Sequence, residues 1–186
     1  SVSRGLGDVY KRQALYYARM DAVYKDYMIA ETNLQEVAQQ VLLQNKYYLI
    51  QSHVKAEVAC PDTVYSDKKW IAFILNQLIQ NSVKYGRSEG TNIQIVTKKT
   101  KSGVLLRVKD DGIGIPKEEI PRIFEKGFTG TNGRNRERST GMGLYLCHKL
   151  CDKLNIEIQA ESAEGKGTEI ILMFPVSDYL TGYRET

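Results

Sequence analysis

The sequence predicts an α/β sandwich in which helices cover one face of a single mixed β-sheet. Three observations predict this fold. Segments with helical spacing of apolar residues come between short runs of strand-forming residues. One such segment places Ile71, Ile74, Leu75 and Leu78 at i, i+3, i+4 and i+7. Finally, 42% of the 186 residues are hydrophobic, which is enough for one domain with its own core.

Polar residues that can act as N-caps mark where the main helices begin. Asn33 precedes a segment with an apolar face formed by Leu34, Val37, Ala38, Val41 and Leu42. Asp67 precedes the strongly amphipathic segment described above. Two further helices are expected, a short one around 118–124 and a longer one over about 143–154.

Runs of strand-forming residues fill the gaps between these helices. The predicted strands are 27–30, 54–58, 92–97, 104–109, 156–160 and 169–174. A Lys/Ser/Gly turn separates the third run from the fourth, so this pair is expected to form a β-hairpin. The polar stretch 116–140 contains several glycines and basic residues and is expected to be a mobile loop.

Composition excludes several classes of protein. The longest apolar runs, 71–75 and 170–174, are far shorter than the roughly 20 residues that span a bilayer, and no signal peptide is visible. Cys60, Cys147 and Cys151 are odd in number and lack C-x-x-C spacing, which favours a reducing cytosol over a disulfide or zinc framework. The net charge of +4 is spread along the chain and argues against a nucleic-acid surface.

A polar stripe lies beside the apolar face of the Asp67 helix. Gln77, Asn81 and Lys84 stand at i, i+4 and i+7, with Tyr85 next to them. The amide oxygen of Asn81 is a suitable ligand for Mg²⁺, and Lys84 could meet a phosphate as a point charge. Without other motifs, a solvated helix face explains the same stripe.

Glycine-rich motifs follow at three places. Asp110 leaves a strand directly into Gly112 and Gly114, where a carboxylate can accept a hydrogen bond from an exocyclic amine and glycines leave room for a planar base. Residues 139–144 open a helix whose first backbone N–H groups favour phosphate oxygens. Residues 165–168 precede the last strand. Taken singly, these motifs are also compatible with an Asp-Gly turn, a flexible helix cap and a β-turn.

In this order and spacing, the four elements resemble the N, G1, G2 and G3 boxes of the Bergerat-fold (GHKL) ATPases. The phrases at 81–85, 123–128 and 141–146 are similar to the histidine-kinase branch, and the resemblance runs from about Ala14 to Pro175. Within that branch, the segment 76–81 and the loop 130–134 resemble intramembrane-sensing kinases that partner peptide-antibiotic ABC transporters.

The resemblance implies a role for each site residue in binding ATP and Mg²⁺. Asp110 would read the adenine amino group, and Asn81 would hold Mg²⁺ and act with Lys84 in catalysis. Phe124 and Phe128 match the F box that anchors the ATP lid. The remaining ATP-binding residues implied are Tyr85, Gly112, Gly114, Ile115, Lys126, Arg138, Thr140, Gly141, Met142, Gly143, Leu144 and Thr168, with Gly165 and Gly167 closing the site and Arg134 and Arg136 as further lid cations.

The chain departs from the family pattern at Gln77, where most histidine kinases carry Asn, so the contact of this amide stays open. Neither His53 nor His148 has the sequence context of a phosphoacceptor histidine. The acceptor hairpin is therefore expected upstream. Segment 14–25 resembles the end of its second helix, 1–13 is expected to be a non-native flank, 26–176 the catalytic ATP-binding domain and 177–186 a tail.

The expected function is transfer of the ATP γ-phosphoryl to a histidine on that hairpin. The expected partners are the hairpin, a response regulator, an ABC transporter and a second copy of the full-length parent. The domain is expected on the cytoplasmic side of a bacterial inner membrane. Two alternatives stay open: an anti-sigma-type serine kinase of the same fold, and a non-catalytic ATP-binding interaction module.

Overall fold

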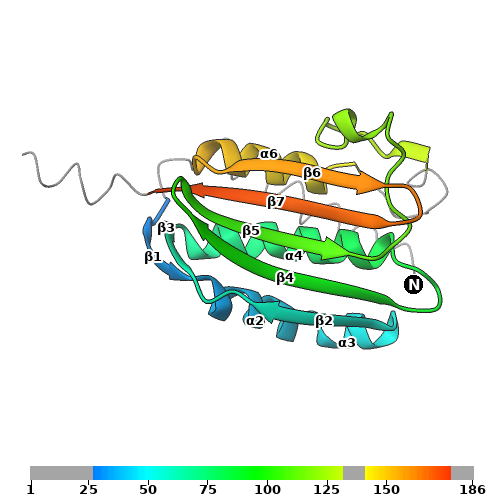
Figure 1. Cartoon of the computed structure of the whole chain (residues 1–186), viewed down its shortest axis with the longest axis horizontal. Helices are drawn as coiled ribbons and strands as arrows, with labels where there is room; N and C mark the ends of the chain where they lie inside the picture. The colour runs from blue at the N-terminus through cyan, green and yellow to red at the C-terminus, as the bar shows by residue number, and fades with distance from the viewer. Residues whose placement is uncertain (1–26, 132–140, 177–186) are drawn as a thin grey trace, which may run out of the picture.

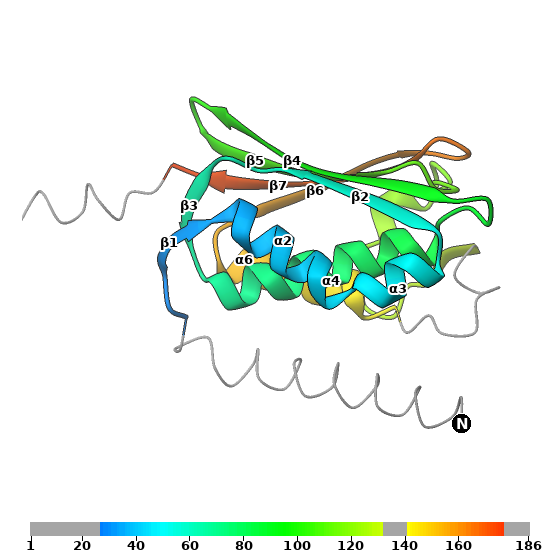
Figure 2. The same cartoon turned by 90° about the horizontal axis from the view of Figure 1, so that it is seen from below.

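The fold consists of two layers, a twisted sheet and a layer of helices packed against one of its faces. The computed structural model describes residues 27–131 and 141–176. Figure 1 looks onto the sheet with the helices behind it, and Figure 2 shows the two layers from the side. The predicted α/β sandwich, with helices on one face of a mixed sheet, is therefore confirmed.

The described elements are the strands β1 to β7, the helices α2, α3, α4 and α6, and one short 3₁₀ helix, η1. Their bounds are β1 Ala30–Asn33, α2 Leu34–Gln44, α3 Lys46–Gln51, β2 Val54–Ala59, β3 Thr63–Ser66, α4 Lys68–Lys84, β4 Thr91–Thr100, β5 Gly103–Asp110, η1 Ile120–Arg122, α6 Gly143–Lys153, β6 Glu157–Ala163 and β7 Gly167–Pro175.

The main sheet has the strand order β2-β4-β5-β7-β6. The β2 and β4 strands are parallel, whereas the other neighbours are antiparallel. The register places Asp110, the last residue of β5, opposite Thr168 near the start of β7. Two of the predicted motifs, far apart in sequence, therefore meet at one end of adjacent strands.

Helix α4 is central to the helical layer and carries much of the core. Its buried residues include Ile71, Ile74, Leu75 and Leu78, the four that the sequence pattern predicted. The side chain of Asp67 accepts hydrogen bonds from the backbone N–H groups of Lys69 and Trp70, which confirms it as the N-cap. Asn33 caps α2 in the same way through the N–H of Glu36.

The first strand was predicted too early in the chain. Residues 27–30 were expected to form it, but β1 begins at Ala30. The N–H of Met28 instead donates to the carboxylate of Asp67 over 2.8 Å, so this part of the chain is tied to the start of α4. The β1 strand pairs antiparallel with β3 in a separate two-stranded sheet.

The helix expected around 118–124 is reduced to the short η1 helix, which contains Pro121. Proline lacks the N–H that a longer helix would use at this position. A segment this short also forms too few hydrogen bonds to offset the unfavourable free energy of helix nucleation. The sequence analysis also missed α3 and β3, which are only six and four residues long.

The three cysteines all lie in the described part of the chain. Cys60, Cys147 and Cys151 are all buried free thiols, and burial raises the pKa of Cys60 to about 11 and that of Cys151 to about 12. Within 27–131 and 141–176, no helix is both long and apolar enough to cross a bilayer. The predictions for 1–13, 14–25 and 177–186 lie outside the described residues.

Candidate functional site

Asp110 is a buried carboxylate at the end of β5, with only 7% of its surface exposed. The backbone N–H groups of Gly112 and Thr168 both donate to its Oδ1, over 3.0 and 3.2 Å. The hydroxyl of Ser82 on α4 also donates to this carboxylate. Burial raises the pKa of Asp110, although these hydrogen bonds oppose the rise. Two backbone amides therefore converge on one oxygen of this carboxylate.

Three segments pack backbone against backbone around Asp110. A Cβ added to Gly112 would lie 2.4 Å from the carbonyl oxygen of Tyr85. One added to Gly114 would lie 2.1 Å from the carbonyl oxygen of Ala163, and one added to Gly167 would lie 2.0 Å from that of Asp110. Gly114 and Gly167 also have positive φ values of 73° and 94°. The backbone packing around Asp110 therefore requires these glycines, independently of any role in ligand binding.

Ser162 on β6 connects the loop after Asp110 to the start of β7 through hydrogen bonds. Its hydroxyl has one proton, which it donates to the carbonyl of Gly167 over 2.7 Å. The same oxygen accepts the N–H of Ile115 over 2.8 Å and lies 2.9 Å from the hydroxyl of Thr168, which must then be the donor. Ile115 and Thr168, two residues implied by the resemblance, are thus brought together by a serine that the sequence analysis did not identify.

The C-terminal part of α4 contributes the polar stripe. Asn81 and Lys84 are partly buried, and Tyr85 is the C-cap residue, whose N–H donates to the carbonyl of Asn81 over 3.1 Å. The Nζ of Lys84 lies 5.5 Å from the centre of the Tyr85 ring. The carbonyl of Tyr85 accepts the N–H of Ile113 over 3.0 Å, which joins this stripe to the loop that follows Asp110.

The start of α6 lies against the same helix. Gly143 begins α6, and the preceding Met142 makes no side-chain cap. The Oε1 of Gln77 lies 2.8 Å from where a Cβ on Gly143 would be. The longer amide that replaces the usual Asn therefore reaches the beginning of the predicted phosphate-binding helix, and its end occupies the space that a Cβ on Gly143 would take.

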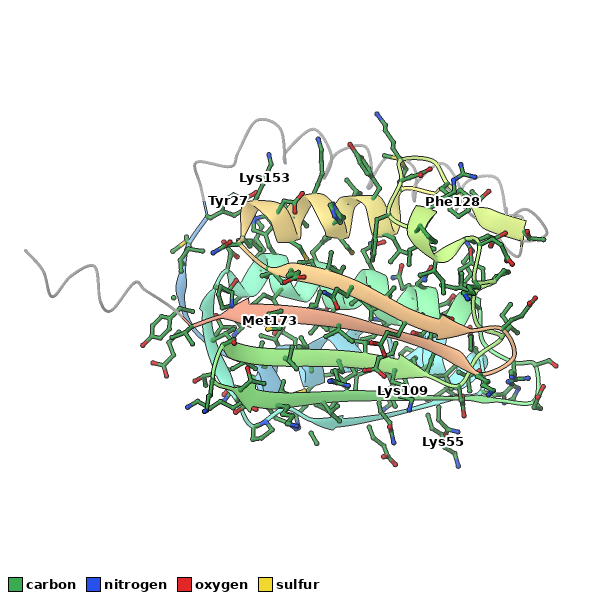
Figure 3. The ribbon with its side chains drawn as sticks, turned by 45° about the horizontal axis from the view of Figure 1, so that its top comes forward. Tyr27, Lys55, Lys109, Phe128, Lys153 and Met173 are labelled. Carbon is green, nitrogen blue, oxygen red and sulfur yellow. The ribbon has the colours of Figure 1, made fainter. Side chains whose placement is uncertain are left out.

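Gly141 packs against the base of the predicted lid. Its carbonyl accepts the N–H of Gly127 over 3.0 Å, and its φ is 67°. Phe124 and Phe128 pack against the core, the Phe124 ring centre lies 5.5 Å from that of His148, and Arg122 lies 4.5 Å from the Phe128 ring. Figure 3 shows Phe128 in the segment beside the start of α6, at the opposite end of this helix from Lys153. Both aromatic residues thus anchor this segment, while Lys126 is exposed.

The structure therefore collects most of the predicted residues at one end of the sheet and helices. One group surrounds Asp110, a second follows the polar side of α4, and Gln77 links the second group to the start of α6, where the partly buried Met142 and Leu144 also lie. Arg134, Arg136, Arg138 and Thr140 lie outside the described residues.

The donors present fit a nucleotide carrying a hard metal ion. In the described part of the chain, no three His, Cys, Asp or Glu residues cluster in a way that could hold a metal. An ion bound here would rely on phosphate oxygens and water, together with the amide oxygen of Asn81, which is the ligand pattern of Mg²⁺. The buried carboxylate of Asp110 and the glycines beside it suit an adenine ring.

Neither histidine is placed as an acceptor by its surroundings. His53 has a φ of 55° in the connection before β2. His148 lies within α6, with its Nδ1 3.5 Å from the carboxylate of Asp152 and its ring beside Phe124.

Comparisons with known proteins agree with this geometry. Residues 66–178 match the model of a family described as histidine kinase-, DNA gyrase B- and HSP90-like ATPases. The sensor histidine kinase YxdK of Bacillus subtilis is 35% identical over 162 residues, which are 86% of this chain and 50% of that protein. The sensor protein kinase GraS of Staphylococcus aureus is 47% identical over 117 residues, 63% of this chain and 33% of that protein.

Solved structures give the same picture. The catalytic domain of the histidine kinase ThkA, in a nucleotide-free form, superposes with a TM-score of 0.68 at 25% identity, covering 80% of this chain and 95% of that domain. A structure of ThkA with the response regulator protein TrrA has a TM-score of 0.70 at 20% identity, covering 92% of this chain and 49% of that one, and shows likeness of fold. The chain spans half of YxdK and a third of GraS.

Proposed function

Because the chain belongs to the family of histidine kinase-, DNA gyrase B- and HSP90-like ATPases, as the ATP-binding catalytic domain of a sensor histidine kinase, we propose that it transfers the γ-phosphoryl of ATP to a histidine on a separate helical hairpin. The observation that carries the proposal is the surroundings of Asp110, where a buried carboxylate lies among closely packed glycines and next to the end of α4. The surroundings of His53 and His148 support an acceptor outside these two residues.

Within this proposal, the two ends of the site have different tasks. Asp110 accepts a hydrogen bond from the adenine amino group, and Tyr85, Gly112, Gly114, Ile115 and Thr168 surround the base. Asn81 holds Mg²⁺, and Lys84, Lys126, Arg138 and residues 140–144 meet the phosphates. Mg²⁺ neutralises charge on the transferring phosphoryl group. The acceptor imidazole is already nucleophilic near neutral pH, so the domain needs to position the γ-phosphoryl rather than supply a strong base.

The partners proposed follow from the same assignment. They are the acceptor hairpin, a response regulator receiver domain and, in the parent protein, a second copy that forms a homodimer. The solved complex of ThkA with TrrA supports a response regulator as partner. The phrases at 76–81 and 130–134 support a parent of the intramembrane-sensing type that works with an ABC transporter, with this domain on the cytoplasmic side of the inner membrane.

The test is to incubate the chain with Mg-ATP labelled on the γ-phosphate, with and without the acceptor hairpin of its own parent. We expect label on the hairpin only, and we expect acid to remove it because phosphohistidine is acid-labile. Transfer should rise with hairpin concentration, since separated parts meet by diffusion. Acid-stable label on the chain itself would favour a serine kinase, and ATP binding without any transfer would favour a non-catalytic module.

A further inference from the structure

Arg87 lies just beyond the C-terminal end of α4, at the outer edge of the site. Its backbone N–H donates to the Oγ1 of Thr91 over 2.7 Å. Gly86 before it lies so close that a Cβ there would be 2.5 Å from the same oxygen. The backbone at Arg87 is thus fixed against the start of β4, and its side chain extends from a defined point.

The guanidinium of Arg87 joins two segments that are far apart in the sequence. Its Nε donates to the carbonyl oxygen of Asp111 over 2.9 Å, in the loop that leaves β5. Its Nη2 donates to the carbonyl oxygen of Gly165, 78 residues away in the turn between β6 and β7. The planar fork of an arginine can make both bonds at once, whereas the single ammonium of a lysine is a compact donor that lacks this fork.

Asp111 holds the other side of this contact in place. Its Oδ1 accepts the N–H of Asn92 over 2.7 Å, and its Oδ2 accepts the side-chain amide of Asn92 over 2.9 Å. Partial burial acts to raise the pKa of Asp111, but the bonds from Asn92 and the charge of Arg87 outweigh it and lower the pKa. The loop is therefore tied to β4 by the Asp111 side chain and to Arg87 by its carbonyl.

Backbone bonds complete a closed set of connections around the loop after Asp110. The N–H of Ile113 donates to Tyr85 at the end of α4, and its carbonyl accepts the N–H of Gly165 over 2.7 Å. The end of α4, the loop after β5 and the β6–β7 turn are thus linked in a ring, with Arg87 bridging its outer side. The loop after β5 and the start of β7, which follows the β6–β7 turn, also supply the amides that donate to Asp110, from Gly112 and Thr168.

We propose that Arg87 is a positioning residue for the adenine end of the site. It sets the spacing between the loop after Asp110 and the β6–β7 turn, and it acts through these segments rather than by touching the nucleotide. The inference rests on the proposed nucleotide site. The two carbonyl groups that accept from the Arg87 guanidinium belong to segments at the end of the site assigned to the base, so loss of Arg87 should weaken every adenine nucleotide alike.

The test uses Arg87→Ala and Arg87→Lys, with Arg107→Ala as the matched control. Arg107 is also partly exposed and pairs with Glu169 over 2.9 Å on β7, so its loss removes the same charge without touching the ring. Binding of ATP and of AMP is measured by NMR titration, which also shows whether each variant is folded. We expect Arg87→Ala to weaken both nucleotides by about five- to tenfold, Arg87→Lys by less, and Arg107→Ala by less than about twofold.

Two further measurements separate positioning from a merely structural role. In transfer to a supplied hairpin, Arg87→Ala should raise the KM for ATP by the same factor and leave the rate at saturating ATP unchanged. Hydrogen exchange of the Ile113 and Gly165 amides should accelerate in Arg87→Ala but not in Arg107→Ala. If Arg87→Ala does not fold, Arg87→Lys decides the proposal. This variant keeps the charge and should still weaken the binding of ATP and of AMP by the same factor.

Unchanged binding in both Arg87 variants would overturn the proposal. A loss confined to ATP would overturn it too, because it would show a contact with the phosphates. Failure of the wild-type chain to bind ATP would count against the proposed function instead, and the exchange measurement would still decide whether Arg87 holds the loop.

Discussion

The two ends of the site are built in different ways. At the adenine end, Asp110 is buried and its position is set by amides from Gly112 and Thr168, with glycines that pack directly against neighbouring backbone. At the end proposed to bind the phosphates, Gln77 meets Gly143 through the end of its side chain, Gly141 packs against the backbone of Gly127, and α6 starts without a side-chain cap. The end proposed to bind adenine is therefore held mainly by backbone contacts, whereas the end proposed to bind the phosphates combines backbone with side-chain contacts.

This difference predicts a division of labour. A preorganised pocket contributes mainly to affinity, because its groups are in place before the ligand arrives. Groups that meet the phosphates contribute most where charge reorganises during transfer. Changes at the adenine end should therefore alter binding or folding, and changes at the phosphate end should alter transfer.

The largest expected effect is a loss of folding stability when a methyl group is added to a glycine at the adenine end. In Gly167→Ala, the new Cβ would lie 2.0 Å from the backbone oxygen of Asp110, which cannot move without shifting the strand. The φ of 94° at this position is also strained for alanine. We expect a loss of about 3 kcal/mol in the free energy of unfolding, measured by urea denaturation.

Gly143→Ala is the matched change at the phosphate end. Its Cβ would meet only the end of the Gln77 side chain, at 2.8 Å, which can rotate away. We expect a loss below about 1 kcal/mol. Equal losses in the two variants would show that both ends are equally rigid and would remove the basis of the comparison.

Asn81→Ala should reduce phosphoryl transfer by about 100-fold or more and ATP affinity by much less, because Mg²⁺ is needed most in the transition state. Transfer to the supplied hairpin and ATP titration measure the two effects. Gln80→Ala is the control, since Gln80 is an exposed amide on the same helix. If transfer and binding fell by the same factor, Asn81 would be a binding residue only.

Asp110→Asn should weaken ATP binding by about tenfold or more, because it removes a charge-assisted hydrogen bond while keeping the size of the side chain. Calorimetric titration of ATP measures the loss. Asp152→Asn, at an exposed carboxylate in α6, controls for the change in net charge. An unchanged affinity in a folded Asp110→Asn variant would disprove its contact with adenine.

Much of this fold could be predicted because the signals are local. The periodicity of α4, the caps Asn33 and Asp67 and the hairpin of β4 with β5 all depend on residues a few positions apart. The short α3 and β3 escaped prediction because four to six residues give little periodicity. The β1 strand was placed too early because the contact between Met28 and Asp67, 39 residues apart, has no local signature.

The site divides in the same way. Asp110, Asn81 and the glycines could be predicted from motifs, whereas Ser82, Ser162 and Arg87 depend on partners from distant segments. Ser82 had one signal that could have found it: it lies four residues after Leu78 on the apolar face of α4, where a buried hydroxyl needs a partner.

The smallest expected effect is a pH dependence that sets the two roles of Asp110 against each other. Burial raises its pKa in the folded protein above the value in the unfolded chain. Between these two pKa values the folded state holds the proton more tightly, so the contribution of this group to folding stability is present below the unfolded pKa and is lost as pH rises through the folded pKa. Ionised Asp110 is the form that accepts the adenine amine, so ATP affinity should instead fall as pH falls through the same window.

Comparing wild type with Asp110→Asn isolates this group, because protonation of ATP itself affects both proteins equally. The ATP affinity of wild type divided by that of Asp110→Asn should fall on acidification, beginning above the ordinary pKa of an aspartate. Over the same pH range, the free energy of unfolding of wild type should rise relative to that of Asp110→Asn. A ratio that stayed constant down to the ordinary aspartate pKa would mean that the carboxylate of Asp110 does not receive the adenine amine. The adenine end would then owe its affinity to the packing of Gly112 and Gly114 rather than to the buried charge.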